Sequence, residues 1–161
     1  MLATMNTLDK TSLYEMSYAF MRRWAFIPVG IPEFPVDGDD DGEALAALVK
    51  NYVAAWNDGE TPEDDETYET IGRMWRAVNE VRAIGPAIVE DVYEHVVAAP
   101  GDDAPDYVSP LIMYVFPQLE GLRRDELEQV LSSLDDDIED TDELWAVARD
   151  FFQVDVRRDG G

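Results

Sequence analysis

The chain contains no cysteine, a single histidine and only two lysines among its 161 residues. The absence of cysteine excludes disulfides and thiolate metal sites, and His95 alone cannot form a histidine-rich metal site within one chain. No apolar run reaches the roughly 18 residues of a membrane-spanning helix. No basic region precedes an apolar run at the N-terminus, so we expect no secretory signal peptide and a cytoplasmic protein.

A phosphate-binding loop is also missing. The pattern Gly-x-x-x-x-Gly-Lys-Ser/Thr, whose backbone amides and lysine hold nucleotide phosphates, does not occur in the sequence. No apolar strand ending in paired acids, of the kind that holds Mg²⁺ beside a nucleotide, precedes the first predicted strand. We therefore do not expect the chain to hydrolyse nucleotide by itself.

The charge is strongly one-sided, with 36 acidic against 12 basic residues and a formal net charge of -24. Acid-rich, lysine-poor surfaces suit high salt, where ions screen the self-repulsion, so we interpret the chain as a halophilic protein. The competing interpretation is an acidic protein that mimics DNA or binds a basic partner. Direct binding of nucleic acid is not expected, because phosphate contacts need clustered lysine and arginine.

Most of the chain is predicted to be helical, since apolar residues recur at helical spacing after residue 42. The aromatic residues of the predicted helices 43–57 and 64–80 are expected to lie in the core: Tyr52, Trp56, Tyr68 and Trp75. His95 is expected to be a partly buried structural residue. The fold class is therefore mainly α. The predicted helices are about 43–57, 64–80, 86–98, 107–119, 123–134 and 141–152.

Local signals suggest how these helices begin and end. Ser109 is expected to cap the fourth helix, and Pro117 should kink or end it. The acidic run 135–137 is predicted to be a solvated loop, and Asp140 with Glu143 suggests a capping box for the last helix. The tail is expected to fray.

The first thirty residues follow a different pattern. A short apolar run at 1–5 is followed by a polar pair, and Ser12 with Glu15 fits a capping box. The box predicts a short helix from about 13 to 23, whose two C-terminal arginines suit the helix dipole. A second apolar run, 24–29, follows at once. The order predicted is strand, polar loop, helix, strand.

This stretch resembles AAA+ ATPases of the McrB-like and MoxR-like branch. The resemblance is carried by Ala3-Thr4-Met5-Asn6-Thr7 with Asp9, and by Tyr18-Ala19-Phe20-Met21-Arg22-Arg23-Trp24 followed by Ala25-Phe26-Ile27. It is sharp over 1–30 and softer over about 31–134. It implies the C-terminal fragment of an α/β AAA+ core at 1–36, a linker at 37–42, and an all-α helical lid with a C-terminal extension at 43–161.

Three residues of the first stretch gain catalytic roles from the resemblance. Asn6 matches the sensor 1 residue, which helps to orient the attacking water near the γ-phosphate; the alternative is an asparagine that caps the following loop. Either Arg22 or Arg23 would reach a neighbouring subunit's nucleotide as an arginine finger. The alternative is that both are solvated bases on an acidic surface.

The turn before the third predicted helix is the other implied site. In the resembled family a glycine-containing turn here carries sensor 2 and faces the nucleotide, which suggests Arg82, Gly85 and Pro86 as nucleotide-proximal residues. Relatives of the MoxR type have an arginine just after the turn, where this chain has Ile88 and Val89. The sensor 2 arginine is thus absent or displaced, and the alternative is an ordinary turn between helices.

The implied function is the sensor and lid portion of an AAA+ NTPase, which couples nucleotide hydrolysis to remodelling or DNA-restriction-type work. ATP or GTP with Mg²⁺ would bind only in a complete module, and no cofactor is expected for this chain alone. Its partners would be the remaining AAA+ core or full-length subunits in a homo-oligomeric ring, and neither nucleic acid nor membrane. The alternatives are a non-catalytic interaction module that binds a full-length AAA+ partner, and an acidic DNA mimic.

Overall fold

The computed structural model describes residues 23, 30–34, 41–62, 65–98 and 105–158. The chain divides into two compact units, Met1–Gly30 and Ile31–Gly161. Almost all of the first unit lies outside the described residues, and with it the strands and short helix expected there. The α/β core fragment over 1–36 therefore stays a prediction, as do the linker 37–42 and the division into core and lid.

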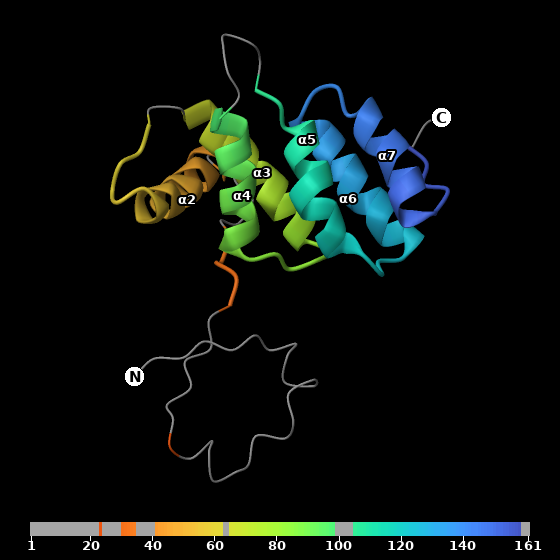
Figure 1. Ribbon diagram of the computed structural model, residues 1–161, viewed down its shortest axis with the longest axis horizontal. Coiled ribbons are helices and arrows are strands. Elements are labelled where there is room, and N and C mark those ends of the chain that lie inside the picture. The colour runs from red at the N-terminus through yellow and green to blue at the C-terminus, as the bar shows by residue number, and fades with distance from the viewer. Residues whose placement is uncertain (1–22, 24–29, 35–40, 63–64, 99–104, 159–161) are drawn as a thin grey trace. The chain divides into compact units, whose positions relative to one another are not determined.

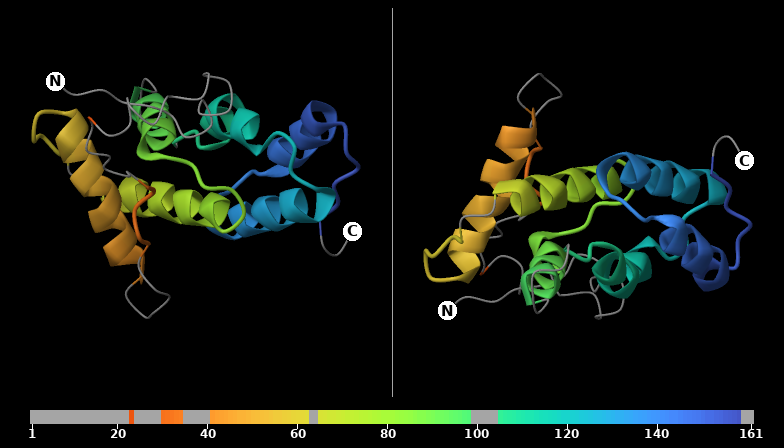
Figure 2. Two further views of the ribbon diagram at one scale, coloured as in Figure 1. Left: turned by 90° about the horizontal axis from the view of Figure 1, so that it is seen from below. Right: turned by 90° about the horizontal axis from the view of Figure 1, so that it is seen from above.

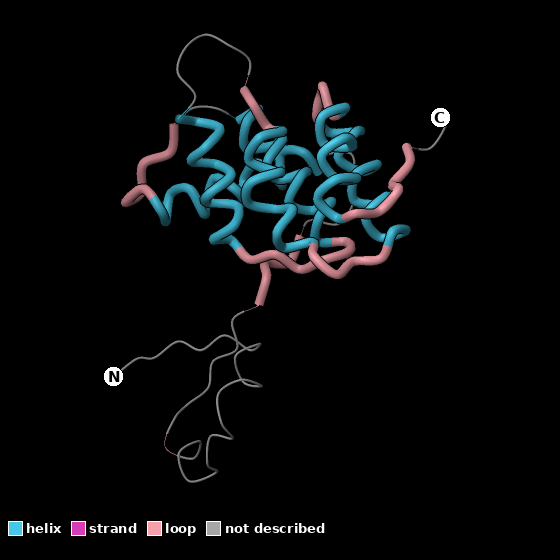
Figure 3. The backbone as a smooth tube through the Cα atoms, turned by 45° about the vertical axis from the view of Figure 1, so that its right-hand side comes forward, coloured by secondary structure: helices cyan, strands magenta, loops and turns pink. Residues whose placement is uncertain are grey.

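The second unit is helical throughout its regular structure, which confirms the mainly α prediction for the described residues (Figure 1). In both views of Figure 2, α3 and α6 lie along one side, α4 and α7 lie along the other, and α2 crosses α3 at one end. Figure 3 shows loops joining the helices and no strand among the described residues. The elements are α2 (Asp41–Trp56), α3 (Asp65–Asn79), α4 (Pro86–Ala98), α5 (Val108–Pro110), η2 (Leu111–Val115), η3 (Phe116–Leu119), α6 (Arg124–Asp137) and α7 (Asp142–Phe152).

The core lies between these helices because each presents an apolar stripe inward. Tyr68 and Trp75 of α3 are fully buried, and Tyr52 and Trp56 of α2 pack against the core, as the sequence predicted. The helices α2 and α3 form the most extensive pair in the unit. They approach closely at Gly72, where an added Cβ would lie 2.9 Å from the Leu45 Cβ atom.

The predicted helix 107–119 is one irregular helix whose hydrogen-bond register changes along its length. It begins as the short α5, continues as the π-helix η2 with the Phe116 amide donating to the Leu111 carbonyl, and ends as the 3₁₀ helix η3. Pro117 explains the change, because its ring has no N–H and clashes with the carbonyl four residues earlier in an α-helix.

Asp106 caps the helix by accepting from the Val108 and Ser109 amides, both at 3.0 Å. The prediction of Ser109 as the cap was wrong, because Asp106 precedes the helix and can reach its free amides.

The acidic run 135–137 belongs to the last turn of α6, so its prediction as a solvated loop was wrong. The carboxylate of Asp135 is held by Thr141, by the Trp145 indole and by Arg158, which keeps the helix in place to its end. Asp140 has a positive φ of 57° and does not cap α7. Thr141 is the N-cap residue instead, without a side-chain cap bond.

The C-terminal segment folds back onto α6 and α7 as far as residue 158. Val156 is fully buried, its carbonyl accepts a hydrogen bond from Arg149, and the Arg157 amide donates to Glu128 at 2.8 Å. The expected fraying therefore does not extend to Arg157 and Arg158, whereas 159–161 lie outside the described residues. Within the described part of the chain, no helix has the length and apolar character needed to cross a membrane.

Candidate functional site

The sequence-predicted site residues fall into two groups in the structure. Asn6 and Arg22 lie outside the described residues, so their roles stay predictions, and Arg23 lies in an exposed turn. Arg82, Gly85 and Pro86 lie together at the connection between α3 and α4. This connection, residues 80–86, is called the α3–α4 turn below and is the part of the predicted site that can be built from side-chain contacts.

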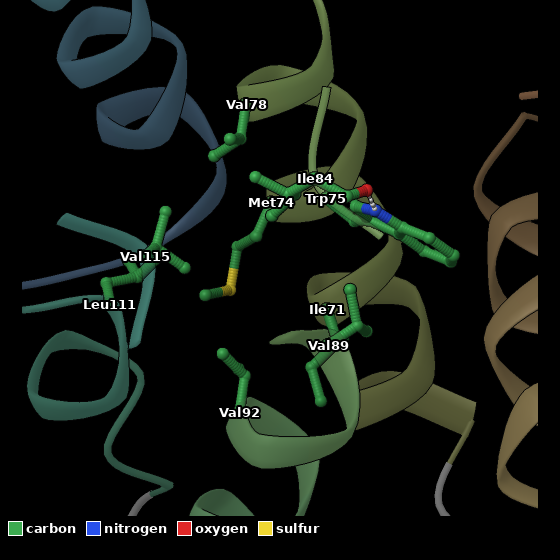
Figure 4. A pocket seen from close by; sticks show the side chains of 9 residues that line it. All are labelled: Ile71, Met74, Trp75, Val78, Ile84, Val89, Val92, Leu111 and Val115. Atoms are coloured by element: carbon green, nitrogen blue, oxygen red, sulfur yellow. Dashed lines mark hydrogen bonds between the residues drawn. The ribbon is translucent and has the colours of Figure 1, made fainter. Parts of the chain in front are cut away.

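Two side chains of α3 hold the backbone of the turn at Ile84. The Trp75 indole N–H donates to the Ile84 carbonyl at 3.0 Å, a buried bond that Figure 4 shows as a dashed line. The Asn79 side chain accepts from the Ile84 amide at 3.1 Å and donates to the Trp75 carbonyl at 2.8 Å. Both backbone polar groups of Ile84 are thus satisfied from α3, so the turn has a defined conformation before any ligand is present.

The α3–α4 turn ends at the start of α4, where Pro86 occupies the first helical position as predicted. The first turn of α4 contains no acidic residue, whereas α2, α3, α6 and α7 each have two there. Free backbone amides at a helix start favour anions, and acids in the first turn compete for them. Among the long helices, α4 is therefore the one whose first turn has no acid to repel an anionic group, although Pro86 has no N–H and the Ile88 amide already donates to the Gly85 carbonyl at 3.2 Å.

The structure does not require a glycine at position 85. An added Cβ would meet no heavy atom within 4 Å, and the backbone is not in the positive-φ region. Neither crowding nor conformation therefore requires glycine at this position. The open space beside Gly85 is compatible with the close approach of a ligand to the backbone.

Arg82 is half-buried, and its guanidinium is turned toward the end of η3. Its Nη2 donates to the Glu120 carbonyl at 3.2 Å, where the negative end of a helix favours a cation. Arg82 and Gly85 therefore belong to one turn, but the Arg82 side chain is engaged with a carbonyl of a different element. Sequence reasoning missed this contact because it joins residues 38 positions apart.

A small apolar cavity of about 20 Å³ lies beside the α3–α4 turn, between α3, α4 and η2 (Figure 4). Its walls are entirely apolar, so it has no partner for a water molecule and should stay dry. Ile84 contributes to the wall, and the Trp75 ring points away from the interior toward α2. The lining residues are Ile71, Met74, Trp75, Val78, Ile84, Val89, Val92, Leu111 and Val115.

A cluster of charges joins α2, α3 and α6. Glu69 and Arg73 pair at 2.7 Å within α3, and Asp41 accepts from Arg76 at 2.8 Å across 35 residues. The hydrogen bond from Arg76 lowers the pKa of Asp41. Asp137 lies at the end of α6, where burial raises its pKa despite the nearby arginines. The described residues contain no group of three His, Cys, Asp or Glu side chains placed to hold a metal ion.

Replacing Asp137 with asparagine is expected to stabilise the protein at pH 7 by about 0.5 kcal/mol, since burial disfavours the charged carboxylate and a negative charge at a helix C-terminus is also unfavourable. A raised carboxyl pKa means that folding favours the protonated form, so the stability of the wild type falls as pH rises from 3.8 through the folded-state pKa. The gain should therefore vanish near pH 3. Urea unfolding at both pH values measures it, and an equal gain at pH 3 would contradict the electrostatic explanation.

Comparison with known proteins gives no assignment: no family model, no curated protein and no solved structure matches the chain.

Proposed function

We propose that the chain is the sensor and lid portion of a McrB-like or MoxR-like AAA+ NTPase in the cytoplasm. It acts together with a front half that carries the phosphate-binding loop, in a homo-oligomeric ring with nucleotide sites between subunits. The observation that supports this best is the α3–α4 turn. Trp75 and Asn79 hold it from α3, and it leads into a helix start without acids.

A nucleotide phosphate can approach so acidic a chain at few places. With a net charge of -24, most of the surface repels phosphate. The start of α4 has no first-turn acid and an open position at Gly85. In the resembled family this turn faces the nucleotide from the lid, so the location and the local electrostatics support the same assignment.

The remaining roles follow from the resemblance. Asn6 would position the attacking water, and either Arg22 or Arg23 would stabilise the transferred phosphoryl group in the neighbouring subunit. Arg82 would stand in for the missing sensor 2 arginine only after leaving the Glu120 carbonyl. ATP or GTP with Mg²⁺ would be held chiefly by the front half, and the work done with hydrolysis would be remodelling or restriction of DNA.

Calorimetric titration of ATP and GTP into the chain alone, at high salt with Mg²⁺, is expected to show no binding. The chain lacks the loop that supplies most of the phosphate contacts, and one helix start is too weak a site by itself. Clear micromolar binding would contradict the proposal, because it would require a phosphate site within these residues.

Joining the chain to the phosphate-binding half of a McrB-like subunit is expected to yield an active NTPase. In that chimaera, Gly85→Asp should lower kcat/KM about tenfold, equal to about 1.4 kcal/mol, because its charge repels phosphate. Gly85→Asn is the matched control, with the same shape and no charge, and should keep activity within about threefold.

Both substitutions should leave unfolding unaffected or slightly improved, since asparagine and aspartate are good residues to precede a helix. Equal activity of the two variants would place the turn away from the nucleotide. A folded chimaera that is inactive, or one whose activity survives Asn6→Ala, would overturn the assignment to a catalytic module. The alternative of a non-catalytic interaction module would then be favoured if the chain still bound a full-length AAA+ partner.

A further inference from the structure

The indole of Trp75 contacts two parts of the molecule that are distant in sequence. Its ring lies edge to face with Phe34, at a centroid distance of 5.2 Å and an interplanar angle of 86°. Its N–H donates to the Ile84 carbonyl at 3.0 Å. The ring is 2% exposed, so neither contact competes with water. One rigid side chain therefore joins the beginning of the helical unit to the α3–α4 turn.

We propose that Trp75 couples the position of the entry segment, residues 31–34, to the conformation of the α3–α4 turn. Trp75 is a positioning residue in this scheme and touches no reacting atom. The consequence for nucleotide binding rests on the proposed function above, because only there does the turn face a nucleotide. The coupling itself is a property of the helical unit and can be measured without any ligand.

The entry segment is suited to transmit a displacement. It directly follows the first compact unit, which ends at Gly30. Pro32 restricts the backbone of this short connection. Phe34 is half-buried and packs against the core. A displacement of residues 31–34 therefore changes the contact between the Phe34 and Trp75 rings.

The α3–α4 turn is suited to respond at Ile84, which is held from α3, whereas Arg82 ties another part of the turn to the Glu120 carbonyl. Trp75 and Asn79 supply the hydrogen bonds at Ile84, whose side chain borders the apolar cavity. The cavity leaves a space of about 20 Å³ on that side of Ile84. On the other side, Tyr52 of α2 contacts the indole at 5.5 Å and stays in place, so loss of Phe34 frees the ring on one side only.

Hydrogen exchange of the full chain, measured at high salt without nucleotide, tests the coupling. Phe34→Ala is expected to raise the exchange rates of the amides over 82–88 about tenfold relative to the wild type. Phe152→Ala is the matched control, since Phe152 is also half-buried and contacts Phe116 at the same centroid distance of 5.2 Å. Its loss should leave 82–88 unchanged. An equal response of this segment in both variants, or none in Phe34→Ala, would overturn the proposal.

Trp75→Phe supplies the second half of the test, because phenylalanine keeps a ring but removes the N–H donor. It should raise exchange over 82–88, and adding Phe34→Ala should then raise it little further, since both changes act through one contact. Simple addition of the two effects would contradict the coupling. Should Trp75→Phe not fold, the indole N–H resonance of Trp75 replaces it: Phe34→Ala must shift that resonance and speed its exchange, and an unchanged resonance overturns the proposal.

These outcomes are separable from those that test the proposed function. An inactive chimaera together with a coupled turn would remove the nucleotide role and leave the coupling intact. An active chimaera that responds to Gly85→Asp, together with an uncoupled turn, would keep the function and remove the role of Trp75.

Discussion

Replacing Asp135 with alanine is expected to lower the free energy of unfolding by about 3 kcal/mol. The carboxylate accepts hydrogen bonds from the Trp145 indole at 2.9 Å, from the Thr141 hydroxyl, and from Arg158 at 2.7 Å. Trp145 and Thr141 are buried, so their donors would be left without partners, and each unsatisfied donor costs about 1–3 kcal/mol. Arg158, which also stacks over Trp145 at 5.6 Å, would lose its main anchor.

Asp136→Ala is the matched control, because Asp136 is the next residue of the same helix and is exposed. It should change the stability by less than about 0.5 kcal/mol, the usual range for a surface position. Guanidinium or urea unfolding of both variants, monitored by circular dichroism at high salt, provides the comparison. Similar losses in the two would mean that the cluster around Asp135 contributes no specific stability.

The same cluster predicts a dependence on pH. Burial by itself would raise the pKa of Asp135, but the hydrogen bonds from Arg158, Thr141 and Trp145 together hold the pKa below its ordinary value. A lowered carboxyl pKa gives a contribution to stability that is complete above the unfolded-state value of 3.8 and is lost as pH falls through the folded-state pKa. The stability difference between the wild type and Asp135→Ala should therefore shrink only below about pH 4.

Gly72→Ala is expected to destabilise the protein by about 2 kcal/mol, although alanine is the better helix former. The new Cβ atom would lie 2.9 Å from the Leu45 Cβ atom and 3.0 Å from the Leu45 carbonyl oxygen, so the helices α2 and α3 would have to separate. A backbone neighbour cannot move aside as the end of a side chain can. The same unfolding measurement applies.

Gly42→Ala on the facing helix is the comparison that isolates this cause. Its Cβ atom would also be crowded, against Oε1 of Glu69, but the atoms that it meets are the ends of the Glu69 and Arg73 side chains. These can rotate away at the expense of one partly exposed ion pair, worth about 0.5 kcal/mol. A loss for Gly42→Ala as large as that for Gly72→Ala would rule out backbone contact as the reason.

Local sequence signals were reliable where the structure depends on neighbouring residues. The helix α4 begins at Pro86 and ends at Ala98, as predicted from its proline and its apolar spacing. The pair Glu69–Arg73 is one helical turn apart and is present. These features need only the period of the helix and the chemistry of its ends, both of which are properties of short segments.

Sequence reasoning failed where a charged residue finds a partner far along the chain. Three consecutive aspartates at 135–137 look like a solvated loop, yet Asp135 is bound by residues up to 23 positions away. With 36 acids and few bases, the sequence allows many pairings for each arginine and favours none of them. The contacts of Trp75 with Phe34 and Ile84 could not be predicted from the sequence either, because nothing in the neighbouring residues distinguishes this tryptophan from any other core residue.

The sequence by itself determined the helical class of the described unit and the aromatic residues of its core, whereas the AAA+ sensor and lid stay a prediction. It did so because amphipathic periodicity and short motifs are local. Only the tertiary structure decided how the α3–α4 turn is held, why Asp135 is not solvated, and which glycine permits the crossing of α2 and α3. Those features arise from long-range packing, in which the partner of each side chain is chosen by the fold as a whole.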